Sequence, residues 1–510
     1  MPFEEQLKEF NERTQHALGM GGPEKLAQRK AQGVLNARER IDLLFDAGSF
    51  VESGRFAVSA RPEDKASTPA DGKIAGFGRV NGRETGVMAN DFTVKGASSA
   101  NINIKKLKHM KLVARKRGIP LVFLGESTGA RMPDVMGAES IGSKDDPLEY
   151  QRLRESPWAA AALGYCFGSS AWYSSMSDYC VFRKGAIVAV SSPRLISMAI
   201  GEEIDAEELG GWRVHSEVSG IADQVVDTDE QAIAAIKQFL SYLPSNNMLP
   251  PPEYPVPVGS GSNMDKVLTL LPESSNQVYD VRKIVRCIVD RDSMFELKPR
   301  FGKAVVTALA RLDGKSVGII ANNPLHRGGA IAADECQKVQ SFFVLCDSYN
   351  VPIVMLVDQP GFLIGPGGEQ RGITGKLMNW MNAMTLVTVP KISVIMRKSY
   401  GLAVSSMGAG GNSDEVACWY TAEVSFMKPE FSARVVLGAD PQRDPEHYRE
   451  SVKKMSKGVS AYDMAAIYTA QDVIDPRHTR EWLIRMLDVH RLRLSNGVGE
   501  HLLRNWPTSY

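Results

Sequence analysis

Residues 352–368 have the sequence PIVMLVDQPGFLIGPGG, and the rest of the chain is organised around this stretch. The apolar run 353–357 ends at a break rich in glycine and proline, which is typical of a buried strand that feeds a tight turn. A second apolar run, ISVIM at 392–396, leads in the same way into YGLA at 400–403. A helix that begins after such a turn leaves its first backbone N–H groups unpaired, and these groups can hold an oxygen that gains negative charge. The stretch therefore predicts an oxyanion site built from the main chain.

The same arrangement of strand, glycine turn and helix occurs once earlier in the chain. In three pairs of corresponding residues, the second residue follows the first by 232 or 233 positions. The pairs are Pro120 with Pro352, Gly82 with Gly314, and Gly168 with Gly401. Three matches in the same order at nearly one spacing predict a duplicated unit. Chance similarity between two α/β segments is the alternative.

The chain is long enough for two domains of ordinary size. It has 510 residues, of which 43% are hydrophobic and 23% charged, as in globular proteins. The formal net charge of +1 gives no reason to expect nucleic acid or a membrane surface as the main partner. Proline and small polar residues at 243–263 favour an extended linker. We therefore expect an N-terminal domain at 1–242 and a C-terminal domain at 264–510.

The cysteines and the N-terminus bear on the cellular compartment. Six cysteines are scattered without a C-x-x-C pair, so reduced thiols are expected rather than a zinc site or a disulfide framework. The N-terminus is too polar for a signal peptide, and no apolar run approaches the roughly 18 residues that a membrane helix needs. A cytoplasmic location is the expectation.

A predicted helix at 101–116 carries six basic side chains. Such charges usually form a solvated face. The alternative is a cationic patch for phosphate groups. Lys95, Gly96, Ala97 and Ser98 support this alternative, because a turn that contains glycine exposes backbone N–H groups.

Eight short motifs spread over nearly the whole chain carry a family resemblance. They are NARER (36–40), NDFTV (90–94), STGAR (127–131), ELGG (208–211), DQPGF (358–362), VPK (389–391), YTAE (420–423) and VIDP (473–476). On these motifs the chain resembles the carboxyltransferase (β) subunit of biotin-dependent acyl-CoA carboxylases, such as propionyl-CoA carboxylase. The resemblance implies an α/β fold with a tandem duplication of two crotonase-like domains, each a ββα superhelix. It also implies that coenzyme A binds the first half and biotin the second.

The resemblance implies a reaction with two transient anions. Carboxybiotin, delivered on a separate carrier, releases carbon dioxide, and its ureido group removes a proton from the carbon next to an acyl-CoA thioester. The resulting enolate attacks the carbon dioxide, so no protein side chain is needed as the base. The protein has to hold one oxyanion on the thioester and one on the ureido group. Two copies of a backbone donor site suit these two charges.

The resemblance also places the site residues. The first donor pair is implied at Gly168 and Ser169, facing the thioester, and the second at Leu402 and Ala403, facing biotin. The position that selects the acyl group corresponds to Ser405. The residues expected to bind substrate are Gly96, Ala97, Ser98, Gly129, Ala130, Arg131, Gly401 and Ser405. No metal site is expected.

The implied partners are a biotin carboxylase and a biotin carboxyl carrier subunit. The Met-Lys pairs at 110–111 and 427–428 lack the Ala-Met-Lys-Met context of a biotinylation site, so the carrier is expected on another chain. No P-loop motif is present, which places the ATP-driven step on another polypeptide as well. A homo-oligomer is implied, with a hexamer built as a dimer of trimers as the favoured form.

Two other functions stay open for the same fold: an acyl-CoA decarboxylase, biotin-dependent or independent, and a non-catalytic scaffold subunit. They arise because the family usually has Gly-Gly-Ala where this chain has GSS at 168–170 and GLA at 401–403. Serine and leucine keep a backbone N–H, so the donors are retained. Their side chains need room that glycine leaves free.

Three single residues are candidates for side-chain catalysis or binding. We expect His215 to be a structural hydrogen-bonding residue, since geometry has to precede any assignment as a base. Asp358 is expected to shape the turn before Pro360 through bonds between its side chain and the backbone. Arg131 either contacts a phosphate or packs in an ion pair.

Overall fold

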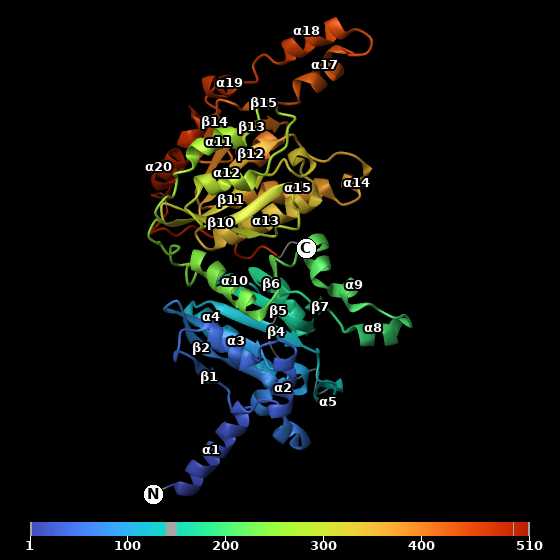
Figure 1. The fold of residues 1–510 in the computed structure, drawn as a ribbon, viewed down its shortest axis with the longest axis vertical. Helices are drawn as coiled ribbons and strands as arrows, with labels where there is room; N and C mark the ends of the chain where they lie inside the picture. The colour runs from blue at the N-terminus through green and yellow to red at the C-terminus, as the bar shows by residue number, and fades with distance from the viewer. Residues whose placement is uncertain (1–2, 139–149, 493, 508–510) are drawn as a thin grey trace. The chain divides into compact units, whose positions relative to one another are not determined.

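The computed structural model describes residues 3–138, 150–492 and 494–507, and its chain forms two compact units. The first unit extends to Met248, and the second begins at Leu249. This division lies within the range 243–263 that the sequence suggests as a linker. Each unit is an α/β fold built on one eight-stranded sheet (Figure 1).

The first unit carries its sheet in the order β1-β2-β3-β4-β5-β6-β8, with β7 paired to β5. Its strands are β1 (Val51–Ser53), β2 (Lys73–Val80), β3 (Arg83–Asn90), β4 (Leu121–Ser127), β5 (Trp158–Phe167), β6 (Tyr179–Arg183), β7 (Ile187–Ala189) and β8 (Gln224–Val226). Its helices include α1 (Glu4–Leu18), α2 (Pro23–Ala31), α3 (Ala37–Leu44), α4 (Asn101–Arg117), α5 (Met132–Val135), α7 (Ser169–Met176), α8 (Pro193–Ile200), α9 (Ala206–Gly210) and α10 (Asp229–Tyr242). The hairpin of β2 and β3 is antiparallel, and β3 to β6 run parallel.

The second unit repeats this topology in the order β9-β10-β11-β12-β13-β14-β16, with β15 paired to β13. Its strands are β9 (Phe295–Leu297), β10 (Val305–Leu312), β11 (Lys315–Asn322), β12 (Ile353–Gln359), β13 (Lys391–Tyr400), β14 (Glu415–Trp419), β15 (Glu423–Ser425) and β16 (Asp472–Ile474). Its helices include α11 (Val267–Leu270), α12 (Val281–Ile288), α13 (Ala333–Ser348), α14 (Pro366–Glu369), α15 (Ile373–Leu386), α16 (Ala403–Ser406), α17 (Pro429–Leu437), α18 (Pro445–Met455), α19 (Ala461–Ala466) and α20 (Thr479–Arg491).

The apolar runs found in the sequence form the central strands. All seven residues of β4 and all seven of β12 are buried. A parallel strand covered on both faces needs such a continuous apolar run rather than an alternating one. The parallel strands all present their carboxyl ends to one edge of the sheet, so the turns after β4 and β5 lie close together, as do those after β12 and β13.

In each unit, one buried lysine ties the long helix to the hairpin. Lys106 of α4 donates to the carbonyl oxygens of Ala70, at 2.9 Å, and Lys73. Lys338 of α13 donates to the carbonyl oxygen of Val305 at 2.7 Å, and each of these two residues lies 232 positions after its counterpart. Burial lowers the pKa of Lys106 to about 8 and that of Lys338 to about 7. This buried bond occurs at equivalent positions in both units, which supports the predicted duplication.

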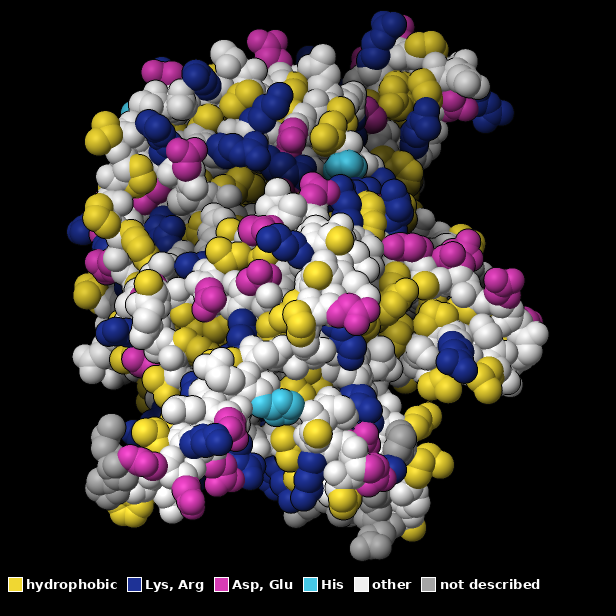
Figure 2. Space-filling model, turned by 60° about the horizontal axis from the view of Figure 1, so that its bottom comes forward, with side chains coloured by type: hydrophobic (Ala, Val, Ile, Leu, Met, Phe, Trp, Pro, Cys, Tyr) yellow, Lys and Arg dark blue, Asp and Glu magenta, His cyan; other side chains and the backbone are white. Residues whose placement is uncertain are grey.

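Several helices extend away from the sheets. In Figure 1, α8 leaves the body of the first unit, and α17 and α18 leave that of the second. Helix α8 buries none of its residues, although it is largely apolar, and α17 exposes Phe431, Val435 and Val436. Acidic and basic side chains are interspersed over the face that Figure 2 presents. Within the described ranges, every helix falls short of the length and apolar character that a membrane span requires.

Candidate active site

The first donor turn joins β5 to α7 at Gly168. This glycine has φ 61° and ψ −127°, a conformation that favours glycine strongly. Among the described residues, the backbone N–H groups of Gly168, Ser169 and Ser170 have no acceptor, whereas Ala171 bonds back to the carbonyl oxygen of Gly168 at 3.0 Å. Three consecutive amides are therefore free at the N-terminus of α7, where the helix dipole favours negative charge.

The second donor turn joins β13 to α16 at Gly401. The N–H of Gly401 is occupied by the carbonyl oxygen of Ser425, at 2.9 Å. The N–H groups of Leu402 and Ala403 have no acceptor in the described part of the chain. Helical bonding resumes at Val404, which donates to the carbonyl oxygen of Gly401 at 3.2 Å. Both residues that the sequence places in the second donor pair thus keep a free N–H.

The substrate-binding residues expected in the first unit lie in two turns beside Gly168. The N–H of Ser99 donates to the carbonyl oxygen of Gly129 at 2.7 Å, and that of Arg131 donates to the carbonyl oxygen of Ser99 at 2.8 Å. Gly129 Cα is 3.7 Å from the point that a Cβ on Gly168 would occupy. The structure therefore brings the segments 96–98 and 129–131 together at the carboxyl ends of β4 and β5.

The turn at Lys95–Ala97 differs from the expectation of exposed amides. The N–H groups of Ala97 and Ser98 donate to the carbonyl oxygens of Val94 and Lys95, at 2.9 and 3.2 Å. These two amides are therefore not available to a phosphate. The carbonyl oxygen of Ala97 instead accepts the hydroxyl of Ser127 at 3.0 Å, so this turn supports the neighbouring one.

The basic side chains of α4 are divided between two environments. Lys106 and Lys111 are buried, whereas Lys105, Arg115 and Lys116 are exposed. The exposed part agrees with the prediction of a solvated face. The buried part was not expected, because helical periodicity cannot show that a lysine will find carbonyl acceptors far away in the sequence.

Arg131 is placed in an ion pair inside the protein. Its guanidinium Nη1 lies 2.6 Å from Asp71 Oδ1, and its Nε donates to the hydroxyl of Ser98 at 3.3 Å. Burial raises the pKa of the Asp71 carboxyl, and Arg131 opposes this effect. Of the two interpretations of Arg131, the geometry favours the ion pair, which holds the turn after β4 against the segment 69–72 before β2.

A buried network of charges lies directly before the STGAR motif. Glu126 accepts two hydrogen bonds from Arg29, at 2.8 and 2.6 Å, and one from Arg40 at 2.8 Å. Arg40 also donates to Asp229 at 2.9 Å. Burial opposes the charge on Glu126, but Arg40 and Arg29 lower the pKa of this carboxyl overall. The network connects α2, α3 and α10 to the end of β4.

The two side chains that replace the family's usual glycine in the donor turns, Ser169 and Leu402, differ in their exposure. Leu402 is 42% exposed, so its bulk faces outward from the second unit. Ser169 is nearly buried, and its hydroxyl lies 3.0 Å from that of Ser99. Ser405, expected to select the acyl group, is half-buried on α16, and its carbonyl oxygen accepts Asn412 Nδ2 at 3.1 Å.

The remaining candidate side chains have structural partners. His215 bonds to the hydroxyl of Ser219 at 2.9 Å and to the carbonyl oxygen of Val188 at 2.7 Å, as a structural histidine would, and burial lowers its pKa. Asp358 does not cap its own turn. It accepts Tyr279 and Arg397, each at 2.9 Å, because a fully buried carboxylate needs strong donors.

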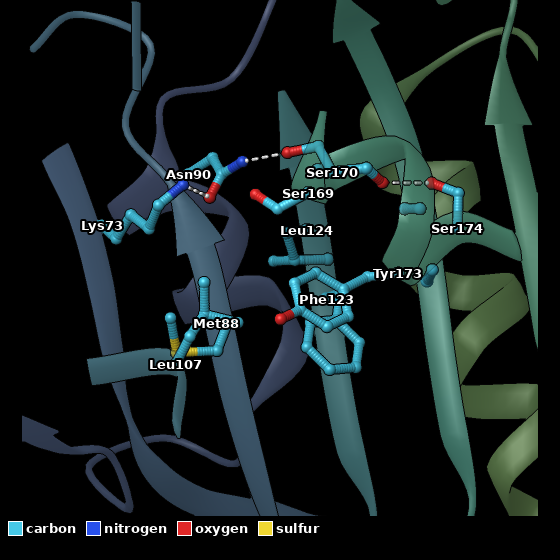
Figure 3. A pocket seen from close by; sticks show the side chains of 13 residues that line it. Lys73, Met88, Asn90, Leu107, Phe123, Leu124, Ser169, Ser170, Tyr173 and Ser174 are labelled. Atoms are coloured by element: carbon cyan, nitrogen blue, oxygen red, sulfur yellow. Dashed lines mark hydrogen bonds between the residues drawn. The ribbon is translucent and has the colours of Figure 1, made fainter. Parts of the chain in front are cut away.

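Two residues around the first turn were not predicted as site residues from the sequence. Lys73 and Ser170 line a cavity of about 20 Å³ beneath the turn, enough for one water molecule, and Figure 3 shows them joined through Asn90. A signal was present in the sequence, because a lysine stands at position 73 where the repeat has Val305. The described residues contain no group of three or more metal-ligating side chains.

The α/β unit is duplicated, and its strand–helix turns leave adjacent backbone amides free. This is the architecture of an enzyme that stabilises oxyanions. Comparison with known proteins supplies the particular family. The chain belongs to the carboxyl transferase domain family, which matches residues 28–495. It is a biotin-dependent acyl-CoA carboxyltransferase, as the sequence motifs predicted.

The similarity covers nearly the full length of the relatives. The chain is 33% identical to the carboxyltransferase subunit of propionyl-CoA carboxylase from Haloferax mediterranei, over 96% of this chain and 98% of that one. It is 32% identical to the methylmalonyl-CoA decarboxylase subunit alpha of Veillonella parvula, over 95% of each. The crystal structure of transcarboxylase 12S, described as a hexamer with methylmalonyl-coenzyme A bound, is 31% identical, with a TM-score of 0.90 over 96% of each chain. The predicted tandem crotonase-like fold is confirmed by this match.

Proposed function

We propose that this chain is the carboxyltransferase subunit of an acyl-CoA carboxylase and transfers a carboxyl group from carboxybiotin to the α carbon of an acyl-CoA thioester. The observation that supports it best is the pair of turns at Gly168 and Gly401, each followed by adjacent amides that have no acceptor among the described residues. Two such donor sites suit a reaction in which negative charge develops on two oxygens.

The first turn is assigned to the thioester. The N–H groups of Gly168 and Ser169 would donate to the thioester oxygen as it gains charge during enolate formation, and Gly129 leaves room beside them. The fixed position of these donors on a helix N-terminus means that little reorganisation is needed when the charge develops. The chain's contribution is therefore to lower the energy of the enolate rather than to remove the proton.

The second turn is assigned to biotin. When bound, carboxybiotin supplies carbon dioxide and the base that removes the α proton. The free N–H groups of Leu402 and Ala403 suit the ureido oxygen, because they are two adjacent donors on one turn. The buried pair of Asp358 and Arg397 holds the ends of β12 and β13 next to this turn.

The partners that this function requires are a biotin carboxylase and a biotin carboxyl carrier protein, and a cytoplasmic location stays a prediction. We also propose a homo-oligomer, with a hexamer as the favoured form, as in the transcarboxylase 12S structure. The exposed apolar side chains of α8 and α17 support association, since extended apolar surface usually marks an interface.

Purified chain should decarboxylate a malonyl-type CoA ester when free biotin is added, because the carboxyl transfer runs in both directions. The rate of carbon dioxide release is measured with a panel of CoA esters, with and without biotin. A decarboxylase that needs no biotin would turn over equally well in its absence. That alternative is not favoured by the family comparisons, and a scaffold subunit would show no turnover under any of these conditions.

A further inference from the structure

We propose that Lys73 is a positioning residue of the first donor turn: through Asn90 and Ser170, its positive charge orients the N-terminus of α7 toward the enolate oxygen. This assignment rests on the proposed function, in which that turn holds the thioester. Figure 3 shows the three side chains in a row along one edge of the cavity, with Phe123 and Tyr173 stacked further in.

Lys73 is a buried cation whose direct partners are neutral. Its ammonium donates to Asn90 Oδ1 and to the carbonyl oxygen of Ala97, each at 3.2 Å. The side chain is 1% exposed, so water does not screen its charge. A lysine in such a position is costly, and nothing in the fold requires it, because the corresponding position of the second unit holds Val305 in the same strand register.

The ammonium fixes the direction of the chain of hydrogen bonds. An ammonium group can only donate, so the amide of Asn90 has to face it with Oδ1. Asn90 Nδ2 then donates to the hydroxyl oxygen of Ser170 at 2.9 Å. The hydroxyl of Ser170 is the acceptor in this bond, and its own hydrogen is left to point elsewhere. The dipole of the Asn90 amide thus directs its positive end away from Lys73 and toward the first turn of α7.

The counterpart of this chain is missing from the second unit. There, Asn322 stands 232 positions after Asn90, but Val305 replaces Lys73, and Ala403 takes the place of Ser170 in its turn. The Nδ2 of Asn322 has no hydrogen-bond partner among the described residues. Among the described residues, the polar chain therefore occurs only in the first unit, to which the proposed function assigns the thioester enolate.

The protonated form of Lys73 is the form that acts. Burial lowers its pKa to about 7, with attraction from Asp71 raising it and repulsion from Arg131 and Lys106 lowering it further. Cys166, another titratable neighbour, is a buried thiol whose own pKa is raised to about 12, so it stays neutral. The electrostatic contribution of Lys73 should therefore decrease as the pH rises through about 7.

The test is Lys73→Met in the full-length chain, assayed by decarboxylation of a malonyl-type CoA ester with free biotin. We expect kcat to fall about tenfold, less than the 10²–10³-fold typical of a direct donor. The decrease of the wild-type rate with rising pH near 7 should disappear. Thermal stability should be kept or increased, because a buried charge is removed. The infrared frequency of a bound thioester carbonyl should rise in the variant, since the carbonyl is less polarised.

Lys338→Met is the matched control, because Lys338 is also buried but bonds only to carbonyl oxygens of the second unit. It should change the melting temperature without changing the carbonyl frequency. Asn90→Leu should lower kcat like Lys73→Met, and the double variant should be no slower than either single one.

The proposal is overturned if Lys73→Met keeps the wild-type rate and pH profile. It is also overturned if the variant loses rate and stability together while the carbonyl frequency is unchanged. A wild-type chain without turnover would instead contradict the proposed function itself.

Discussion

Leu402→Pro should abolish carboxyl transfer while acyl-CoA binding is largely retained. Leu402 has φ −65°, the value that proline prefers, and Gly401 before it tolerates the restriction that proline imposes. The substitution therefore removes the N–H with little change of the backbone. The loss of one oxyanion donor typically costs about 3–4 kcal/mol of transition-state stabilisation, or roughly a 10²–10³-fold loss of rate.

Leu402→Gly is the control for this experiment, because it removes the side chain and keeps the N–H. It should retain most of the rate, since the leucine side chain is exposed. Binding of acyl-CoA by both variants is measured by calorimetry. Equal turnover of the proline and glycine variants would remove the second turn from the mechanism.

Glu126→Ala should destabilise the first unit by about 3–5 kcal/mol, the usual result of leaving buried partners unpaired. Arg29 and Arg40 both bond to this carboxylate and are themselves buried. Without Glu126, Arg29 loses its carboxylate, and Arg40 keeps only Asp229. The free energy of unfolding is measured by urea denaturation, with the transition of each unit followed separately.

Glu9→Ala is a useful comparison, because Glu9 forms an exposed ion pair with Arg13 on α1. Such surface pairs contribute little, so this variant should unfold like the wild type within about 1 kcal/mol. If Glu126→Ala also left the free energy of unfolding nearly unchanged, the buried network would not be what fixes the end of β4. In that case the position of the STGAR motif would depend on the turn contacts alone.

The part of the fold that the sequence predicts is the part set by local pattern. The apolar runs LVFLG (121–125) and IVMLV (353–357) form buried strands, and the strand next to each of them ends at a glycine, Gly168 or Gly401. Strand, turn and repeat spacing were therefore all visible in the sequence. The free amides after these glycines were predicted for the same reason. Gly401 itself was assigned to the substrate, whereas its N–H bonds to Ser425, a contact that no local pattern contains.

The contacts that were not predicted join residues far apart in the sequence. Asp358 was expected to cap its own turn, but it pairs with Arg397, which lies in the next parallel strand. Arg29 and Glu126 are hydrogen-bonded but lie 97 residues apart, and no sequence motif links the two positions. Lys73 could have been noticed only by comparing the two halves position by position, because a single lysine in a strand is otherwise read as a solvent-facing residue.

The paired ties of Lys106 and Lys338 share no atom with the amides of either reactive turn. In each half, the bonds that attach the long helix to the hairpin therefore do not use the amides proposed to hold the anions. Substitutions at Leu402 can then arise without breaking either tie, whereas Gly168 and Gly401 are held to glycine by their positive φ. One ancestral half, copied once, was in this way free to become two specialised partners.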